Sequence, residues 1–505
     1  MTAETTEQAG SAPRRQPGTT AERRQPAERP SWRFDPTEGL AALRGLLARP
    51  LASYYLLISS AGLLLVIGLT MVFSATSVSA YAEKGSAFAD LAKQGLYAFI
   101  GLVGFWLCQR LPAKSFRSLG GPVLAGSLLL LVVLDLLLVF QSLAHLKVAR
   151  VGPLEADLLW LYIGPIGLQP SEIAKFGMVL WGAEVVARKG AAVGWWRELL
   201  MPLAPAIGLL FLLVGYNDLG TMLCLLAIVV GLLWAAGVRM RIFATLGAVG
   251  VAGIGLLIAA ASLGAGSGST DAENYRLLRL TAFLHQNDPK CLQSACYQLG
   301  MARAAIDHGG WFGVGLGKSV LKWDWLPQAR NDFIYAILAE ELGVVGCAVV
   351  LALLAVLAYT GLRIARRVND PFRRLAAAAA TTWLISQALI NIGGVVGLLP
   401  ITGLPLPFIS DGGSALVVTL AAIGMLASFA RSEPDAARAL NARPPAPWVR
   451  LLWAPLPPIP GRRRPEPAAD RRPGPKSGRR DTGARPTDGR VDRERAAGAG
   501  RGRRR

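Results

Sequence analysis

The apolar residues of this chain gather into long runs, not into short amphipathic stripes. A helical run of about twenty apolar residues matches the hydrocarbon thickness of a bilayer. The pattern therefore predicts an all-α polytopic membrane protein. Ten transmembrane helices are expected, at about residues 53–74, 93–109, 119–140, 170–187, 199–215, 219–237, 242–263, 332–360, 375–396 and 414–431.

The loops between these runs alternate between strongly basic and weakly basic. Short basic loops follow spans two, four, six and eight, with clusters at Arg110/Lys114/Arg117, Arg188/Lys189/Arg197, Arg239/Arg241 and Arg363/Arg366/Arg367/Arg373/Arg374. Short loops rich in Lys and Arg stay in the cytoplasm. With an even number of spans, both termini are then cytoplasmic, and residues 264–331 form a large extracytoplasmic loop between spans seven and eight.

Composition agrees with this organisation and adds two tails. The chain is 52% hydrophobic and carries a formal net charge of +20, with the basic excess at its ends. We expect a disordered basic N-terminal tail at 1–50, a membrane domain at 51–431 and an Arg/Pro-rich C-terminal tail at 432–505, both tails cytoplasmic. No folded basic module with interleaved aromatic residues accompanies the charge, so membrane-surface attraction and partner docking are favoured over nucleic-acid binding. The first apolar run begins near Ser53, which argues against a cleavable signal peptide.

Five cysteines are too few for a disulfide scaffold. Three lie in or beside apolar runs and are expected to be small buried residues. Cys291 and Cys296 instead fall in the polar stretch "KCLQSACYQ". They are a disulfide candidate if this loop lies outside the cytoplasm.

Charged residues at the starts of two predicted spans are candidate site residues. Glu172 and Lys175 in "QPSEIAK" are three residues apart and share a helical face. They form either a structural ion pair or a contact to a ligand. Asp218 in "GYNDLG" lies between two spans, where it could cap a helix, bind a cation or face a substrate.

The long loop ends in a glycine-rich run at residues 309–317. Glycines let a backbone approach a ligand closely, and Lys318, Lys322, Arg276 and Arg279 in the same loop could meet phosphate. The run lacks the spacing of a nucleotide-binding P-loop, so that function is excluded.

A second irregular segment, "VVGLLPITGLPLPFISDGGSAL", connects the last two spans. Its repeated Pro and Gly predict a non-helical path, and Ser410, Gly412 and Gly413 offer a hydroxyl and backbone N–H groups to a ligand. Irregular backbone near membrane depth is tolerated where it lines a cavity. The alternative is a re-entrant loop with a packing role.

Three carboxylates occur in "LPQARNDFIYAILAEELGVVG", at the start of the eighth span. An ionisable residue at membrane depth is costly and usually marks a site. Asp332 opens the predicted helix, where the helix dipole favours ionisation and partial burial opposes it. Asp332 is therefore the candidate catalytic residue, whereas Glu340 and Glu341 lie deeper and are expected to hold helices together.

Several of these motifs occur in one order that resembles a known family. "QPSEIAK", "DLGT", the "YQ" before the glycine-rich run, "DFI" followed by "EELG" and "GLLP" followed by "GGS" match the FtsW/RodA group, the SEDS (shape, elongation, division and sporulation) proteins. The resemblance covers about residues 53–431. The long tails and "KWDWLPQARNDFI" are most similar to actinobacterial members of its division branch.

The resemblance implies a fold of ten spans and a peptidoglycan glycosyltransferase activity. Members polymerise lipid II, the undecaprenyl-linked peptidoglycan precursor, on the outer face of the cell membrane, here during septal wall synthesis. They work with a class B penicillin-binding protein, which supplies the transpeptidase, and with other division proteins. The family's essential aspartate corresponds to Asp332, and its motif residues to Glu172, Lys175, Asp218 and Gln298.

This activity gives the candidate residues a chemical role. A sugar hydroxyl must attack an anomeric carbon that carries a lipid pyrophosphate, and a positioned carboxylate such as Asp332 can act as general base. Loop Arg and Lys residues, or a divalent cation such as Mg or Mn, could stabilise the leaving pyrophosphate. The alternatives are a lipid II flippase or transporter, and a non-catalytic division scaffold. A flippase should line a route through both leaflets, whereas the unusual segments here fall on one side.

Overall fold

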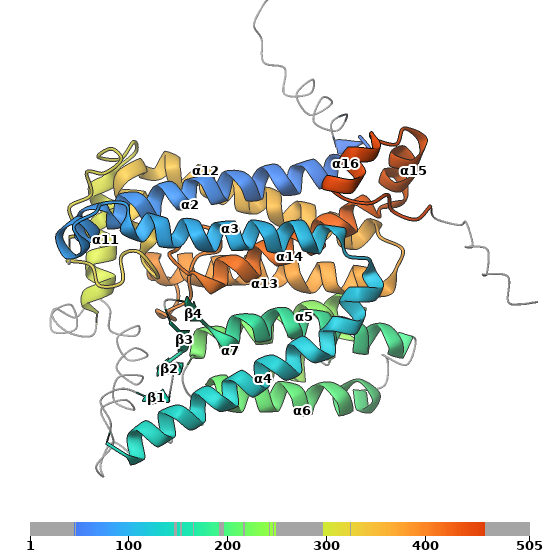
Figure 1. Ribbon diagram of the computed structural model, residues 1–505, viewed down its shortest axis with the longest axis horizontal. Helices are drawn as coiled ribbons and strands as arrows, with labels where there is room; N and C mark the ends of the chain where they lie inside the picture. The colour runs from blue at the N-terminus through green and yellow to red at the C-terminus, as the bar shows by residue number, and fades with distance from the viewer. Residues whose placement is uncertain are drawn as a thin grey trace, which may run out of the picture. The chain divides into compact units, whose positions relative to one another are not determined.

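The computed structural model describes residues 45–459, apart from residues 249–295 and short gaps at 46, 146–148, 152–153, 165, 191–195, 216–217, 242, 246 and 324. Helices make up most of this region (Figure 1). They are α2 (Ala52–Lys84), α3 (Ala89–Arg110), α4 (Ala113–Leu143), α5 (Pro170–Lys189), α6 (Trp196–Gly215), α7 (Leu219–Ala235), α11 (Tyr297–Gly309), α12 (Ile334–Arg367), α13 (Pro371–Val396), α14 (Ser414–Arg431), α15 (Pro434–Ala442) and α16 (Pro447–Leu452).

Nine of the predicted spans coincide with helices, namely α2 to α7 and α12 to α14. Within the described residues, six helices are long and apolar enough to cross a membrane: α2, α3, α4, α12, α13 and α14. Shorter apolar stretches occupy α6 and α7. The predicted span at 242–263 lies mostly outside the described residues, so the total of ten stays a prediction. The polytopic helical membrane fold itself is confirmed.

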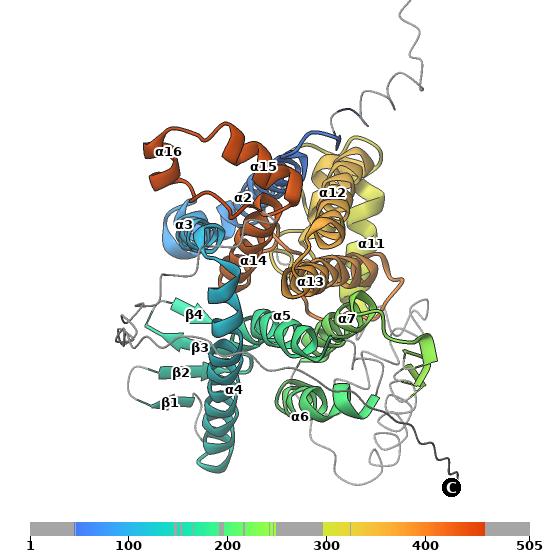
Figure 2. The ribbon, with the colours of Figure 1, turned by 90° about the vertical axis from the view of Figure 1, so that its right-hand side faces the viewer.

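Helix α13 lies at the centre of the bundle. Viewed along the helices, it is surrounded by α5, α7, α12 and α14 (Figure 2). Five consecutive alanines, residues 376–380, are all buried, and their small side chains allow neighbouring helices to approach closely. Trp383 is also fully buried. A polar group on the buried faces of α13 therefore needs a partner within the protein.

A four-stranded antiparallel sheet connects α4 to α5 and departs from the all-α prediction. Its strands β1 (Ala149–Val151), β2 (Leu154–Asp157), β3 (Trp160–Ile163) and β4 (Ile166–Leu168) follow one another in chain order across the sheet. Ala156 and Leu161 pack against Leu134 of α4. Strands of three or four residues are too short for alternation of apolar and polar residues to be recognised in the sequence.

Helix α12 is kinked at Gly343, whose φ is 67° and ψ is −168°. This backbone conformation favours glycine because it has no Cβ. Two carbonyls before the kink accept hydrogen bonds from the glycine-rich run instead of from α12 itself: Val314 N–H donates to Glu340 O (2.9 Å) and Gly315 N–H to Glu341 O (3.0 Å). The glycine-rich run thus packs closely against α12 at Gly309 and Gly313, and its approach to a ligand stays a prediction.

Ordered structure continues beyond the predicted end of the membrane domain at residue 431. Helices α15 and α16 follow α14 directly, and Glu433, Ala436 and Ala437 are buried. The part of the predicted tail that the structure describes, up to residue 459, is folded onto the bundle.

Candidate active site

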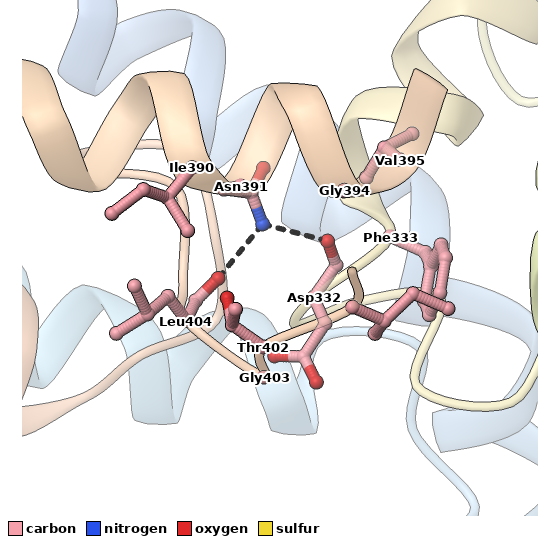
Figure 3. Close-up of a pocket in the computed structure, with 10 residues that line it drawn as sticks. Asp332, Phe333, Ile390, Asn391, Gly394, Val395, Thr402, Gly403 and Leu404 are labelled. Carbon is pink, nitrogen blue, oxygen red and sulfur yellow. Dashed lines mark hydrogen bonds between the residues drawn. The ribbon is translucent and has the colours of Figure 1, made fainter. Parts of the chain in front are cut away.

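Asp332 lies in the turn immediately before α12 and is half-buried. It borders a small pocket between this turn, the last turns of α13 and the non-helical residues 397–413, called here the 397–413 segment (Figure 3). The pocket is lined by Asp332, Phe333, Ile390, Asn391, Gly394, Val395, Ile401, Thr402, Gly403 and Leu404. The predicted catalytic carboxylate is therefore not sealed among hydrocarbon side chains.

Asn391 of α13 joins the two irregular walls of this pocket. Its side-chain amide donates to the main-chain carbonyl of Asp332 (2.8 Å) and to that of Leu404 (2.7 Å), as Figure 3 shows. The Asn391 Oδ1 atom is buried without a hydrogen-bond partner among the described residues. The carboxylate of Asp332 extends toward Gly403, where an added Cβ atom would lie 3.7 Å from Oδ2. The backbone of Asp332 is thus held by Asn391, and its carboxylate lies beside Gly403.

Ser410 holds the far end of the 397–413 segment against the Asp332 turn. Its hydroxyl donates to Asn331 O (2.7 Å) and accepts from Leu406 N–H (2.7 Å). Asp411 N–H donates to Arg330 O (3.0 Å). Gly412 and Gly413 are buried beside this contact. In this conformation the Ser410 hydroxyl serves the main chain, and its predicted contact with substrate stays a prediction, as does that of the two glycines.

Glu172 and Lys175 form an ion pair of 2.8 Å inside the bundle, with side chains 1% and 0% exposed. Lys175 Nζ also donates to Gln387 Oε1 (3.0 Å), and Gln387 Nε2 donates to Pro405 O (2.9 Å). The structure thus favours the structural interpretation of the pair. Through Gln387, this pair supports the 397–413 segment. Asn391, one helical turn after Gln387 on α13, holds the same segment.

Asp218 caps α7, the first of the three roles suggested by the sequence. Its Oδ1 accepts from Thr221 N–H (2.8 Å) and its Oδ2 from the Thr221 hydroxyl (2.6 Å), and the residue is buried. The capped turn presses against the pocket wall, since a Cβ atom at Gly220 would lie 2.8 Å from Thr402 O. A direct contact between Asp218 and substrate stays a prediction.

The other predicted substrate-binding residues belong to the long loop. Gln298 is half-buried in the first turn of α11, and Lys318 is exposed. Arg276 and Arg279 lie outside the described residues. Their roles stay predictions.

The structure describes one of the two cysteines of the predicted disulfide. Cys296, at the start of α11, is buried and disulfide-bonded. Cys291, its predicted partner, lies outside the described residues, so the pairing stays a prediction.

Glu340 and Glu341 hold the long loop to the bundle, which agrees with the structural role expected for them. Glu340 Oε1 lies 3.0 Å from His308 Nδ1, and Glu341 accepts from the Ser74 hydroxyl (2.7 Å) and from Lys322 Nζ (2.9 Å). Lys322 is 4% exposed in its side chain. It is therefore engaged in an internal ion pair, and its contact with a phosphate stays a prediction.

Gln387 and Asn391 are functional candidates that the sequence analysis missed. Both are amides in the membrane-spanning helix α13, four residues apart, so they share one face. Polar side chains at membrane depth usually mark a buried network. That signal was available in the sequence, but the partners, which are main-chain carbonyls, carry no sequence signature.

The part of the chain that the structure describes offers no cluster of side chains that could bind the expected divalent cation. Within that part, no group of three or more His, Cys, Asp or Glu residues could hold an ion. No step is therefore assigned to a Mg or Mn ion.

Comparisons with known proteins agree with the motifs. The chain is 41% identical to the probable peptidoglycan glycosyltransferase FtsW of Mycobacterium tuberculosis over 414 residues, which cover 81% of this chain and 74% of that protein. It is 33% identical over 375 residues to stage V sporulation protein E of Bacillus subtilis, covering 73% and 94%.

A solved structure is also similar. It concerns the structural coordination of polymerization and crosslinking by a peptidoglycan synthase complex, and one of its chains matches with a TM-score of 0.55 and 25% identity, covering 75% of this chain and 97% of that one. A family model described as "Cell cycle protein" matches residues 54–434. The chain belongs to the FtsW/RodA/SpoVE family of cell cycle proteins.

Proposed function

We propose that this protein is a peptidoglycan glycosyltransferase that polymerises lipid II into glycan strands during cell division, with Asp332 as general base. The relative from M. tuberculosis carries the name of this activity. The observation that carries the role of Asp332 is its position: a half-buried carboxylate at a pocket, on a backbone held by Asn391.

The reaction needs a proton acceptor beside an incoming sugar. The acceptor hydroxyl attacks the anomeric carbon of the donor as the bond to the undecaprenyl diphosphate breaks. Asp332 takes the hydroxyl proton, and the diphosphate leaves with the bonding electron pair. General-base catalysis of this kind contributes about 10²- to 10⁴-fold to a rate. Holding the Asp332 main chain at one place keeps the carboxylate oriented before substrate arrives.

Positive charge for the leaving diphosphate comes from the long loop in this proposal. Lys318 is exposed, and Arg276 and Arg279 belong to the same loop. Lys and Arg bind phosphate oxygens through charge-assisted hydrogen bonds. Glu172, Lys175 and Asp218 act on the reaction through the 397–413 segment, as positioning residues.

The proposal includes a partner and a location. The matched peptidoglycan synthase complex couples polymerization with crosslinking, which supports a class B penicillin-binding protein as partner. The basic ends of α3, α5 and α12 support a cytoplasmic position for that end of the bundle and for both termini. The setting is the cell membrane at the division septum.

The test is polymerisation of labelled lipid II by the purified full chain, with and without its penicillin-binding protein, resolved on gels. Asp332→Ala and Asp332→Asn should lower the rate at least about 100-fold, since neither can accept the proton. Asp307→Ala, an exposed carboxylate on α11, is the matched control and should keep the normal rate. A normal rate for both Asp332 variants would refute the assignment.

A flippase or a scaffold would behave differently in that experiment. The names of the relatives do not favour either alternative. Lipid II movement across reconstituted vesicles without any polymer would support the flippase, and an inactive chain that still recruits its partner would support the scaffold.

A further inference from the structure

Residues 434–459, called here the C-terminal clasp, fold back onto the last turns of α3. The indole N–H of Trp453 donates to the Tyr54 hydroxyl of α2. The indole N–H of Trp106, in the last turns of α3, donates to Leu452 O (2.6 Å). Figure 2 shows α16 at the edge of the bundle beside α3, away from the central helix α13. The clasp is thus tied to the bundle at the rim, where a membrane protein meets lipid.

The clasp presents large apolar side chains outward although its backbone is tied down. Trp448 is 66% exposed, Leu451 71% and Leu452 61%. A surface that faces water rarely carries a contiguous apolar patch. Such a patch usually marks a contact with a membrane or with another protein. The clasp contacts α3 at Trp106, and Leu102 and Leu107 of the same helix are also exposed. Because α3 is long and apolar enough to cross a membrane, that face of it meets hydrocarbon.

Basic residues surround the apolar patch. The Arg110 guanidinium donates to Leu451 O and stacks over the Trp106 ring, 4.7 Å from its centroid. Arg443 is exposed and Arg450 is half-exposed in the clasp. An apolar strip with Trp and Leu, flanked by Arg, is the pattern of a segment that lies in the membrane interface. Basic residues near an anionic membrane surface add electrostatic attraction to the burial of apolar side chains.

We infer that the C-terminal clasp is an interfacial membrane anchor that binds anionic phospholipid. Trp448, Leu451 and Leu452 lie at the boundary between headgroups and acyl chains, and Arg443 and Arg450 contact lipid phosphates. Charge complementarity and continuity with the lipid-facing side of α3 favour a bilayer over a protein partner. The anchor would fix the end of α14 and the start of α2 relative to the bilayer, independently of the catalytic pocket.

The inference can be tested by labelling the full chain in nanodiscs. Cys108, Cys224 and Cys347 are replaced by alanine, and a nitroxide is attached at Leu451→Cys. In a separate variant, the nitroxide is attached at Arg438→Cys, an exposed position of α15, as the matched control. Collision rates with oxygen and with a water-soluble nickel complex report whether each label is in lipid or in water. Nanodiscs contain phosphatidylcholine alone or with one third phosphatidylglycerol.

We expect the label at position 451 to collide preferentially with oxygen, and this preference to increase several-fold with phosphatidylglycerol. The label at position 438 should remain water-accessible in both lipids. A water-accessible label at 451 in both lipids would overturn the inference and leave the patch to a protein partner. A lipid-like label at 451 that ignores phosphatidylglycerol would overturn the assigned binding of anionic lipid.

A second measurement avoids the cysteine replacements. Trp448→Phe removes one exposed indole, and the fluorescence difference from the unmodified chain isolates Trp448. Lipids brominated near the headgroup end of the acyl chain should quench this difference signal at least about two-fold. An unquenched difference signal would contradict the anchor even if the labelled variants misfold.

Discussion

The side-chain amide of Asn391 donates a hydrogen bond to the main-chain carbonyl of Asp332, 2.8 Å away. The same nitrogen donates to Leu404 O (2.7 Å), so one buried side chain ties the proposed catalytic turn to the 397–413 segment. Asn391 does not touch the reacting carboxylate. It acts through the backbone, which makes it a positioning residue for the proposed general base.

Replacing Asn391 should therefore impair polymerisation as well as stability. Asn391→Ala leaves two carbonyls without their donor, and each such loss costs about 1–3 kcal/mol. We expect the polymerisation rate to decrease about 10- to 100-fold while lipid II still binds. Asn391→Asp should be equally slow, because a carboxylate cannot donate.

The control for this change lies on the same helix. Leu389 is 59% exposed and faces away from the pocket, so Leu389→Ala should keep nearly full activity. Rates and lipid II binding are measured on the same preparations. Full activity of Asn391→Ala would show that the turn before α12 is held without this amide.

The sequence predicted the elements of this site better than their contacts. Long apolar runs indicated nine described helices, and a carboxylate at the start of a span marked Asp332. The bonds from Asn391 to main-chain carbonyls could not be predicted, because any residue supplies such a carbonyl. The partners of Glu341 are Ser74 and Lys322, and Ser74 is 267 positions away, a distance that no local pattern reveals.

The glycine-rich run shows how a local pattern can indicate a close approach without indicating what is approached. The sequence indicated that a backbone approaches something closely near residues 309–317, and this is correct. It could not distinguish a ligand from the kinked helix α12. The kink depends on Gly343, and the paired carbonyls of Glu340 and Glu341 become available only because that helix is broken.

Gly313 provides a direct test of this packing. Its φ is +76°, and an added Cβ atom would lie 2.1 Å from Glu341 O. Gly313→Ala should destabilise the protein by at least about 1–3 kcal/mol, because it combines backbone strain with a clash against main chain. Hydrogen exchange of residues 310–323 should increase together with the loss of thermal stability.

Gly62→Ala is the matched control for that substitution. An added Cβ atom there meets no atom within 4 Å, and the residue is inside α2. Alanine is a better helix former than glycine by about 1 kcal/mol, so this variant should be as stable as the original or more stable. Equal stability of the Gly313 and Gly62 variants would contradict the packing role.

Substitutions in the buried pair of Glu172 and Lys175 should distinguish its contribution to stability from its role in positioning the 397–413 segment. Lys175→Met leaves Glu172 charged and buried, and losing one partner of such a pair costs about 3–5 kcal/mol. We expect a large decrease in melting temperature, followed with a thiol-reactive dye that reports exposure of the buried Cys224. Lys114→Met, at an exposed position, should leave the melting temperature unchanged.

The double variant Glu172→Leu/Lys175→Met removes both charges. Apolar replacement of a buried pair is often neutral, so most of the melting temperature should return. Polymerisation should stay low, because Gln387 has lost its bond from Lys175 and holds Pro405 less firmly. Recovery of both stability and activity would show that the pair does not position the 397–413 segment.

The stability of the folded protein should depend on pH through Asp411, which lies in the same segment. Burial raises the pKa of its carboxyl above the ordinary value, and Asp90 acts in the same direction, while Arg330, Lys93 and Lys84 lower it. A carboxyl with a raised pKa stabilises the folded state fully below its unfolded pKa, which is about 3.9, and loses this contribution as pH rises through the folded pKa. Ionisation of Asp411 as the pH rises therefore weakens the fold.

Asp411→Asn cannot ionise, so it should keep that contribution at every pH. We expect the variant to melt at a higher temperature than the unmodified chain at pH 7, and the two melting temperatures to converge toward pH 4. Melting curves between pH 4 and pH 7.5 check this, with Asp307→Asn on α11 as the exposed control that shows no difference. A variant that melts lower at pH 7 would mean that the attraction of Arg330, Lys93 and Lys84 outweighs burial. In that case the ionised form of Asp411 holds the 397–413 segment in place.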